Sequence, residues 1–218
     1  MPGYKTKEFM GVSLYGQLRS VQRVGGVYND TLNGETDRPV EADPDSFEVD
    51  QAYVELTHLP DTEITAGRRK IKLGNQRFIS DLGWRQNNRS FDGAVIENRS
   101  LPNTYLHYSY ANNVNRAFTD DSSKGNFDEA DIHVIHAEHS PFKNLKLTGY
   151  GYILGIEEES FAGASNLATN TYGGNIRGSQ PLSDDFTLLY EGEYANQTDN
   201  TENANDLDLD YYRVDLGG

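Results

Sequence analysis

The sequence predicts an all-β protein, an antiparallel up-and-down transmembrane β-barrel, and three observations lead to this fold class. Apolar and polar residues alternate with a period of two along much of the chain, whereas helical periodicity is scarce. Short and long connections alternate along the chain between these predicted strands. The 218 residues include 14 Tyr, 9 Phe and 21 Gly, which is typical of chains rich in strands and turns.

The composition excludes several other classes of protein. The chain has no Cys, so it cannot form disulfides or thiolate metal sites, and its net charge of −15 argues against a nucleic-acid partner. No segment approaches the ~18 to 20 apolar residues of a membrane-spanning helix. The first residues, 1–5, show no apolar segment of a signal peptide, which taken alone predicts a cytoplasmic protein. The strand pattern argues against that localisation.

The alternation predicts about eleven strands. In the segment 12–21, for example, Val12, Leu14 and Leu18 fall on one face, and polar residues fall on the other. The expected strands lie at residues 2–8, 12–22, 48–58, 62–73, 91–100, 104–111, 131–139, 145–156, 170–179, 186–196 and 207–217.

The connections between these strands show a repeat of one hairpin. Four short turns each contain a proline, and the intervals between Pro60, Pro102, Pro141 and Pro181 are 42, 39 and 40 residues. Proline suits a tight turn because its φ is fixed and it has no N–H for a strand ladder. Longer polar loops alternate with these turns, near residues 23–47, 74–90, 112–130, 157–169 and 197–206.

Three architectures could produce this repeat. A propeller blade has a period of ~40 to 45 residues but contains four strands, where this sequence has room for two. A soluble barrel or sandwich requires a clearly apolar inner face. A transmembrane barrel has ~10-residue alternating strands, short turns on one side and long loops on the other, which fits best. It also explains the mean hydropathy of −0.71, because only the outward face must be apolar.

Tyrosines near the predicted strand ends are expected to form aromatic girdles at the membrane interfaces. The residues expected there are Tyr105, Tyr108, Tyr110, Tyr150, Tyr152, Tyr211 and Tyr212.

Positive charge is concentrated in residues 67–91, which contain seven Lys or Arg and one Asp. A lipid-facing position cannot hold several charges, because each costs ~2–4 kcal/mol at the membrane midplane. The period of two therefore predicts that Arg68, Lys70 and Lys72 face the lumen. Ile71 and Leu73 are expected to face outward, and Arg69 is expected near a membrane interface. Such cations could contact a permeating anion.

The candidate anion-contacting residues are Arg68, Lys70, Lys72, Arg77, Arg85 and, less strongly supported, Arg116. The alternative is that they pair with carboxylates of the lumen wall, such as Glu55, Glu191 and Glu193, and only stabilise it.

Several segments also resemble a known family. The segment 39–118, with the motifs "NQRF", "GWRQN" and "NVNR", is similar to the alginate-export-type outer-membrane porins of Gram-negative bacteria, as are "LKLTGYGYILGIEEES", "TLLYEGEYANQTDN" and "DLDYYRVDLGG". The resemblance covers nearly the whole chain. It implies a monomeric barrel of about eighteen strands in outer-membrane lipid. It also implies an electropositive lumen for alginate or other anionic solutes, with no catalytic residue and no cofactor.

Compared with that family, the sequence lacks a signal peptide and the closing strands. We therefore expect residues 1–218 to form a single partial β-barrel domain, with about eleven of the roughly eighteen strands. The rival hypothesis is a soluble or surface β-protein that binds acidic glycans, and an enzyme acting on such glycans ranks behind both.

Two segments raise the question of metal binding. In "HVIHAEH", residues 133–139, alternation places His133 and His139 on one face and His136 and Glu138 on the other, so one ion could not use all four. The acidic segment 25–50 resembles a calcium loop only loosely and lacks the EF-hand spacing. The sequence therefore predicts no metal site.

Overall fold

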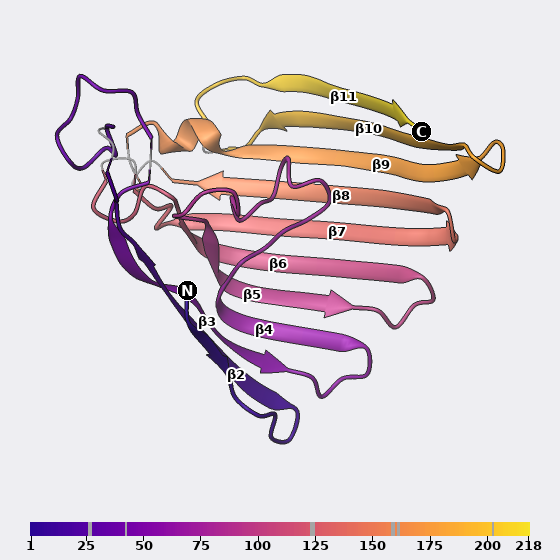
Figure 1. Ribbon diagram of the computed structural model, residues 1–218, viewed down its shortest axis with the longest axis horizontal. Coiled ribbons are helices and arrows are strands. Elements are labelled where there is room, and N and C mark those ends of the chain that lie inside the picture. Colours follow the sequence, from indigo (N-terminus) through magenta and orange to yellow (C-terminus); the bar gives the residue numbers. More distant parts are fainter. Residues whose placement is uncertain (26–27, 42, 123–124, 158–159, 161, 202) are drawn as a thin grey trace.

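A computed structural model describes residues 1–25, 28–41, 43–122, 125–157, 160, 162–201 and 203–218. The chain forms one antiparallel sheet of 11 strands, and each strand is hydrogen-bonded to its neighbours in sequence, in the order β1 to β11 (Figure 1). The predicted all-β, up-and-down topology is confirmed. Because neighbouring strands are joined by the chain itself, the sheet needs no crossover connection.

The predicted strand positions agree with the structure to within a few residues, apart from β4 and β6. No helix in the described part of the chain is long and apolar enough to cross a membrane. The elements are β1 (Gly3–Lys5), β2 (Val12–Val21), β3 (Ser46–Leu56), β4 (Thr62–Arg69), β5 (Ser90–Asn98), β6 (Thr104–Asn115), β7 (Ala130–Phe142), β8 (Leu145–Ile156), the 3₁₀ turn η2 (Ala164–Leu167), β9 (Thr169–Pro181), β10 (Thr187–Asp199) and β11 (Asp208–Gly217).

The connections are short at one end of the sheet and longer at the other, as predicted. The turns that join β3 to β4, β5 to β6, β7 to β8 and β9 to β10 contain between two and five residues. The connections at the opposite end are longer and include residues 70–89 and 116–129 (Figure 1). This asymmetry is the pattern of outer-membrane barrels.

The two faces of the sheet differ in polarity. On one face, which we call the inner face, side chains such as Thr65, His107 and His136 are buried, although they are polar. The opposite, outer face exposes large apolar side chains, and Val214 is 76% exposed. Further outer-face residues of this kind are Leu14, Leu18, Ile96, Ile135, Leu147, Ile176 and Leu216. An exposed apolar face of this extent is costly in water and favourable in lipid.

The predicted tyrosine girdle is only partly compatible with these faces. Tyr150 and Tyr152 are buried on the inner face, and Tyr105 and Tyr211 pack against the same hydrophobic cluster, so these four cannot face lipid. The remaining three, Tyr108, Tyr110 and Tyr212, have exposed side chains and fall on the outer parity of their strands. The error arose because tyrosine is common on both faces of a strand.

Glycine allows two pairs of neighbouring strands to approach closely, β3 with β4 and β5 with β6. The register of β5 and β6 shifts between Asp92 and Gly93, where Asn112 of β6 is the extra residue of a β-bulge, and a Cβ added at Gly93 would lie 2.0 Å from the carbonyl oxygen of Tyr110. Gly67 has φ of +126°, and its added Cβ would lie 2.3 Å from the carbonyl oxygen of Ala52. Only glycine tolerates such contacts.

Candidate functional site

The connection between β4 and β5, residues 70–89, is folded against the inner face of the sheet, and we call it the inner loop (Figure 1). Its residues Ile71 and Leu73 are buried in the same hydrophobic cluster as Val134 and Tyr152 of the sheet. The prediction that Ile71 and Leu73 point outward is therefore wrong. The strand ends at Arg69, and the apolar residues that follow are buried under the loop rather than in lipid.

The tip of the inner loop, residues 74–78, packs on three tyrosines of the inner face. The ring centroid of Phe78 lies 5.7 Å from that of Tyr150, 6.1 Å from that of Tyr152 and 5.7 Å from that of Tyr211. Each aromatic pair at such distances contributes ~0.5–1.5 kcal/mol beyond its buried area. The tip is therefore attached to strands that lie far from β4 in the sheet.

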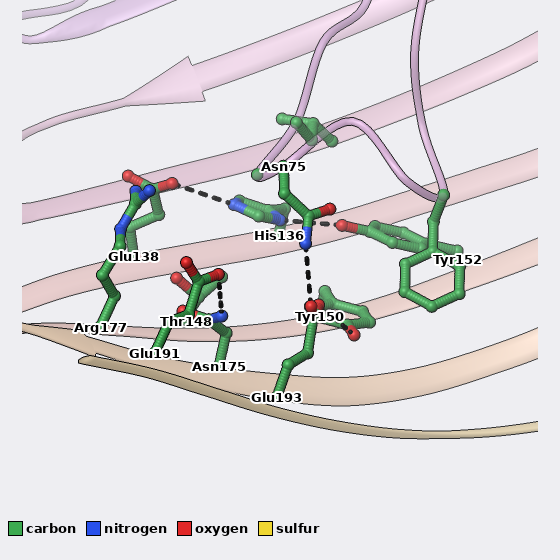
Figure 2. Close-up of a pocket in the computed structure, with 13 residues that line it drawn as sticks. Asn75, His136, Glu138, Thr148, Tyr150, Tyr152, Asn175, Arg177, Glu191 and Glu193 are labelled. Carbon is green, nitrogen blue, oxygen red and sulfur yellow. Dashed lines mark hydrogen bonds and ion pairs between the residues drawn. The ribbon is translucent and has the colours of Figure 1, made fainter. Parts of the chain in front are cut away.

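A buried carboxylate connects the tip to the wall by hydrogen bonds, as Figure 2 shows. Asn75 donates from Nδ2 to Oε2 of Glu193 at 2.9 Å. The hydroxyl of Tyr150 donates to the other oxygen, Oε1, also at 2.9 Å. Because Glu193 is on β10 and Tyr150 is on β8, one carboxylate links the inner loop to two strands.

A small pocket lies beside the tip, and its polar wall groups are mostly satisfied by one another. His136 is within hydrogen-bond distance of the Tyr152 hydroxyl, at 3.0 Å, and lies 3.4 Å from Glu138. Lys146 donates to the other oxygen of Glu138 at 2.6 Å. The cavity volume is about 30 Å³, enough for one or two water molecules. The tip is therefore closely docked to the wall here.

Both stems of the inner loop are held by one buried ionic cluster. Arg19 of β2 donates to Asp50 of β3 at 2.8 Å and also to the side chain of Asn88. Lys70 donates to the second oxygen of Asp50 at 2.6 Å. The side chain of Asp50 is 0% exposed, at a point where the register of β2 and β3 shifts. Ion pairs desolvated in this way depend on complete pairing.

Arg68 and Arg69 have exchanged the positions expected of them. Arg69 extends along the inner face, where it donates to Thr65 at 3.0 Å and to Glu97 at 2.7 Å. Arg68 has the opposite strand parity and makes two hydrogen bonds of 2.8 Å to Asp92. The predicted lumen position of Arg68 is therefore wrong. A strand near its end can place a neutralised Arg–Asp pair on the outer face, where the long side chain reaches the interface.

Three other predicted cations are paired with carboxylates. Lys70 is bonded to Asp50, as described above, and Lys72 lies 3.0 Å from Asp81. Arg85 lies 3.1 Å from Glu41. Only Asp50 belongs to a strand of the wall, because Asp81 lies in the inner loop and Glu41 in the connection between β2 and β3, and none of the three expected wall carboxylates is a partner. Whether these cations also contact a permeating anion stays a prediction.

Arg77 and Arg116, the last two candidates, have different surroundings. The exposed side chain of Arg77 places its guanidinium 5.0 Å from the ring centroid of Tyr211, and it makes no ion pair within the described ranges. Arg116 lies 4.6 Å from the ring centroid of Phe127, and burial together with the charge of Arg89 lowers its pKa to about 10. Arg77 is therefore the predicted residue best placed at the tip of the inner loop.

The three predicted lumen acids do lie on the inner face. Glu55 accepts from Lys5 at 2.5 Å. Glu191 accepts from Arg213 at 2.9 Å and from an asparagine, and Glu193 holds the loop tip. Their negative charge is therefore largely compensated by the wall itself, and their role as counter-residues for the six predicted cations is not what the structure shows.

Sequence reasoning missed Arg177, which lines the pocket beside the tip (Figure 2). It is an exposed residue of β9, and it makes no ion pair with the residues the structure describes. Its cross-strand neighbours are Lys146 and Glu191, whose charges are paired elsewhere. Arg177 and Asn175 are two residues apart on a regular strand, so their side chains lie on the same face. This alternation was the sequence signal that could have identified Arg177 as a residue of the inner face.

The predicted metal candidates do not come together. His133 and His136 lie on opposite faces, as expected, with His133 bonded to Tyr108 and His136 to Tyr152. Within the described ranges, no three His, Asp or Glu side chains are close enough to hold an ion. In the acidic segment 25–50, residues 26, 27 and 42 lie outside the described part.

A comparison with protein families decides the relationship of this chain. The sequence profile of the family described as alginate export matches residues 14–207. The chain belongs to the alginate export family. None of the curated proteins matches the sequence. The matched residues include the whole inner loop and strands β3 to β10.

Solved structures agree with this family and identify the fold. OpdK of Pseudomonas aeruginosa, solved with vanillate, has a TM-score of 0.66 at 15% identity, covering 94% of this chain and 52% of OpdK. OccAB2 of Acinetobacter baumannii has a TM-score of 0.64 at 13% identity, covering 93% and 50%. OccD3 (OpdP) of P. aeruginosa has a TM-score of 0.57 at 18% identity, covering 78% and 40%.

These similarities indicate a bacterial outer-membrane β-barrel, and OpdK is itself described as an outer-membrane protein. The chain spans about half of the length of the structures it matches. The sheet therefore matches about half of each of these β-barrel chains.

Proposed function

We propose that the whole protein is a monomeric outer-membrane porin that passes anionic solutes, such as uronates or an alginate-like acidic polysaccharide. The polar inner face lines the lumen, and the inner loop narrows it. The outer face contacts lipid, which disfavours the rival hypothesis of a soluble glycan-binding protein. No covalent step is required, so the wall residues act only by their charge and shape.

The observation that carries the anion preference is the pair Arg77 and Arg177 near the loop tip. Both are exposed, and neither has an ion-pair partner among the described residues. The carboxylates around them are already compensated: Glu138 by Lys146, and Glu191 by Arg213. A permeating anion would therefore meet two available cations at the narrowed part of the lumen. Weak, multiple contacts of this kind favour entry without trapping.

Two further points support an anionic solute. The family is named for export of alginate, an acidic polysaccharide, and OpdK was solved with vanillate, a carboxylate. Guanidinium groups bind carboxylates through two parallel hydrogen bonds, whereas Lys acts as a point charge. Both proposed contacts are arginines.

Reversal potentials in planar bilayers under a KCl gradient test this proposal in the whole protein. The double variant Arg77→Gln with Arg177→Gln should shift the reversal potential toward lower anion preference, and each single variant should shift it less. Lys143→Gln is the matched control, because it also removes one positive charge but lies in the turn between β7 and β8. An unchanged reversal potential in the double variant would exclude the proposed role of these two arginines.

A further inference from the structure

The side-chain amide of Asn75 makes two hydrogen bonds of opposite kind at the tip of the inner loop. Its Oδ1 accepts from the main-chain N–H of Arg77 at 3.0 Å. Its Nδ2 donates to Oε2 of Glu193 at 2.9 Å, which Figure 2 shows. A main-chain N–H can only donate and an ionised carboxylate can only accept, so one orientation of the amide satisfies both partners. A single neutral side chain therefore connects Arg77 to the wall.

The main chain around this amide forms a compact hairpin. The N–H of Gln76 donates to the carbonyl oxygen of Leu73 at 2.9 Å, and the N–H of Leu73 donates to the carbonyl oxygen of Ile79 at 3.3 Å. Within this hairpin, the bond from the N–H of Arg77 to the side chain of Asn75 closes an Asx turn. The point at which the Arg77 side chain leaves the loop is thus fixed by the side chain of Asn75.

The far end of the Arg77 side chain rests on an aromatic ring. Its guanidinium lies 5.0 Å from the ring centroid of Tyr211, and Phe78 meets the same ring edge-on, with an interplanar angle of 87°. A ring face attracts a cation without neutralising its charge. Among the residues with a described position, Arg77 has no ion-pair partner. Arg77 is therefore held in place and still carries an available charge.

Glu193 is a carboxylate that could neutralise this charge, but its oxygens have other partners. It is buried, and its two oxygens accept from the amide of Asn75 and from the hydroxyl of Tyr150, both at 2.9 Å. Arg213 lies 3.9 Å from the oxygen that Asn75 occupies and supplies a positive charge beside it. Because a neutral amide holds the oxygen linked to the tip, Arg77 stays outside ion-pair distance of Glu193.

We propose that Asn75 is a positioning residue that keeps Arg77 available to permeating anions. It fixes the main chain of Arg77, and it occupies the carboxylate with which Arg77 would otherwise pair. Without the amide, Glu193 would lose a donor and attract the guanidinium, since a buried carboxylate requires partners. Anion preference would then fall although no charge had been removed. This inference rests on the proposed function, because it requires that Arg77 contacts the solute.

Reversal potentials of the whole protein in planar bilayers under a KCl gradient test the role of Asn75. Asn75→Ala removes both hydrogen bonds and leaves the net charge unchanged. It should shift the reversal potential toward lower anion preference, by roughly half or more of the shift that Arg77→Gln causes. In the Arg77→Gln background, Asn75→Ala should add little further shift, because coupled residues are not additive.

Two other variants serve as the matched control and the conservative replacement. Gln76→Ala removes a neutral amide from the next position, where its oxygen lies 3.4 Å from the hydroxyl of Ser80, and should keep the wild-type reversal potential. Asn75→Ser keeps an acceptor for the N–H of Arg77 but is too short to reach Glu193. It should therefore shift the potential less than Asn75→Ala, and it replaces that variant if Asn75→Ala fails to fold.

The outcomes separate this inference from the proposed function. If Arg77→Gln shifts the reversal potential and Asn75→Ala does not, the positioning role is overturned and the proposed function stands. Equal shifts from Asn75→Ala in the wild-type and Arg77→Gln backgrounds also overturn it, because the amide then acts independently of Arg77. If Arg77→Gln itself leaves the potential unchanged, the proposed solute contact at Arg77 fails and the role of Asn75 fails with it.

Discussion

Replacing Phe78 by Ala should release the tip of the inner loop from the barrel wall. Phe78 contributes three aromatic contacts, to Tyr150, Tyr152 and Tyr211, at 5.7 to 6.1 Å between ring centroids. At ~0.5–1.5 kcal/mol for each pair, the contacts sum to ~1.5–4.5 kcal/mol. Because Phe78 is only partly buried, we take ~2–3 kcal/mol as the loss. The ratio of docked to undocked tips should then fall roughly 30- to 150-fold.

Single-channel recording measures this release directly. An undocked tip leaves a wider and more variable lumen, so Phe78→Ala should increase the mean conductance, the open-channel noise, or both. Phe142→Ala is the matched control, since Phe142 is 66% exposed and lies at the turn end of β7, opposite the end of the sheet at which the inner loop begins and ends. If Phe78→Ala keeps wild-type conductance and wild-type noise, the aromatic contacts do not hold the loop and the reasoning fails.

Two further predictions concern the stability of the wall. Arg19→Ala leaves the buried carboxylate of Asp50 with Lys70 as its remaining cation, so the free energy of unfolding should fall by ~3–5 kcal/mol. Urea titration in detergent measures this loss. A loss under ~1 kcal/mol would contradict the importance of the cluster. Gly93→Ala should prevent formation of the compact, heat-modifiable form on gels, because the new Cβ would collide with the carbonyl of Tyr110. Gly149→Ala should fold normally, since nothing lies within 4 Å of its added Cβ, and equal behaviour of the two variants would refute this account.

The architecture was predictable because its signals are local. Each hairpin carries its own alternation and its own turn proline, so the positions of Pro60 and Pro102 already separate one hairpin from the next. The end of β4 was not predictable in this way. Alternation continues beyond Arg69, and only the burial of Ile71 and Leu73 under the inner loop shows that the strand has stopped.

The candidate site was predicted only in part, because its decisive contacts connect distant parts of the chain. Phe78 meets Tyr211, and Asn75 meets Glu193, across more than a hundred residues of sequence. No periodic pattern encodes such pairs. The same limit explains the exchange of Arg68 and Arg69, since an error of one residue in parity moves a side chain to the other face of a sheet.

The inner loop also has a mechanical consequence for the barrel. Its stems are fixed to β2 and β3 through Arg19 and Asp50, whereas its tip is fixed to β10 through Glu193. In Figure 1, these strands lie toward opposite ends of one curved sheet. The inner loop therefore spans the concave side of the curved sheet and is attached near both ends of it. Because the loop has a fixed length, it limits how far the sheet can open or flatten. The curvature of this part of the sheet thus depends on the length of the inner loop as well as on the pairing of the strands.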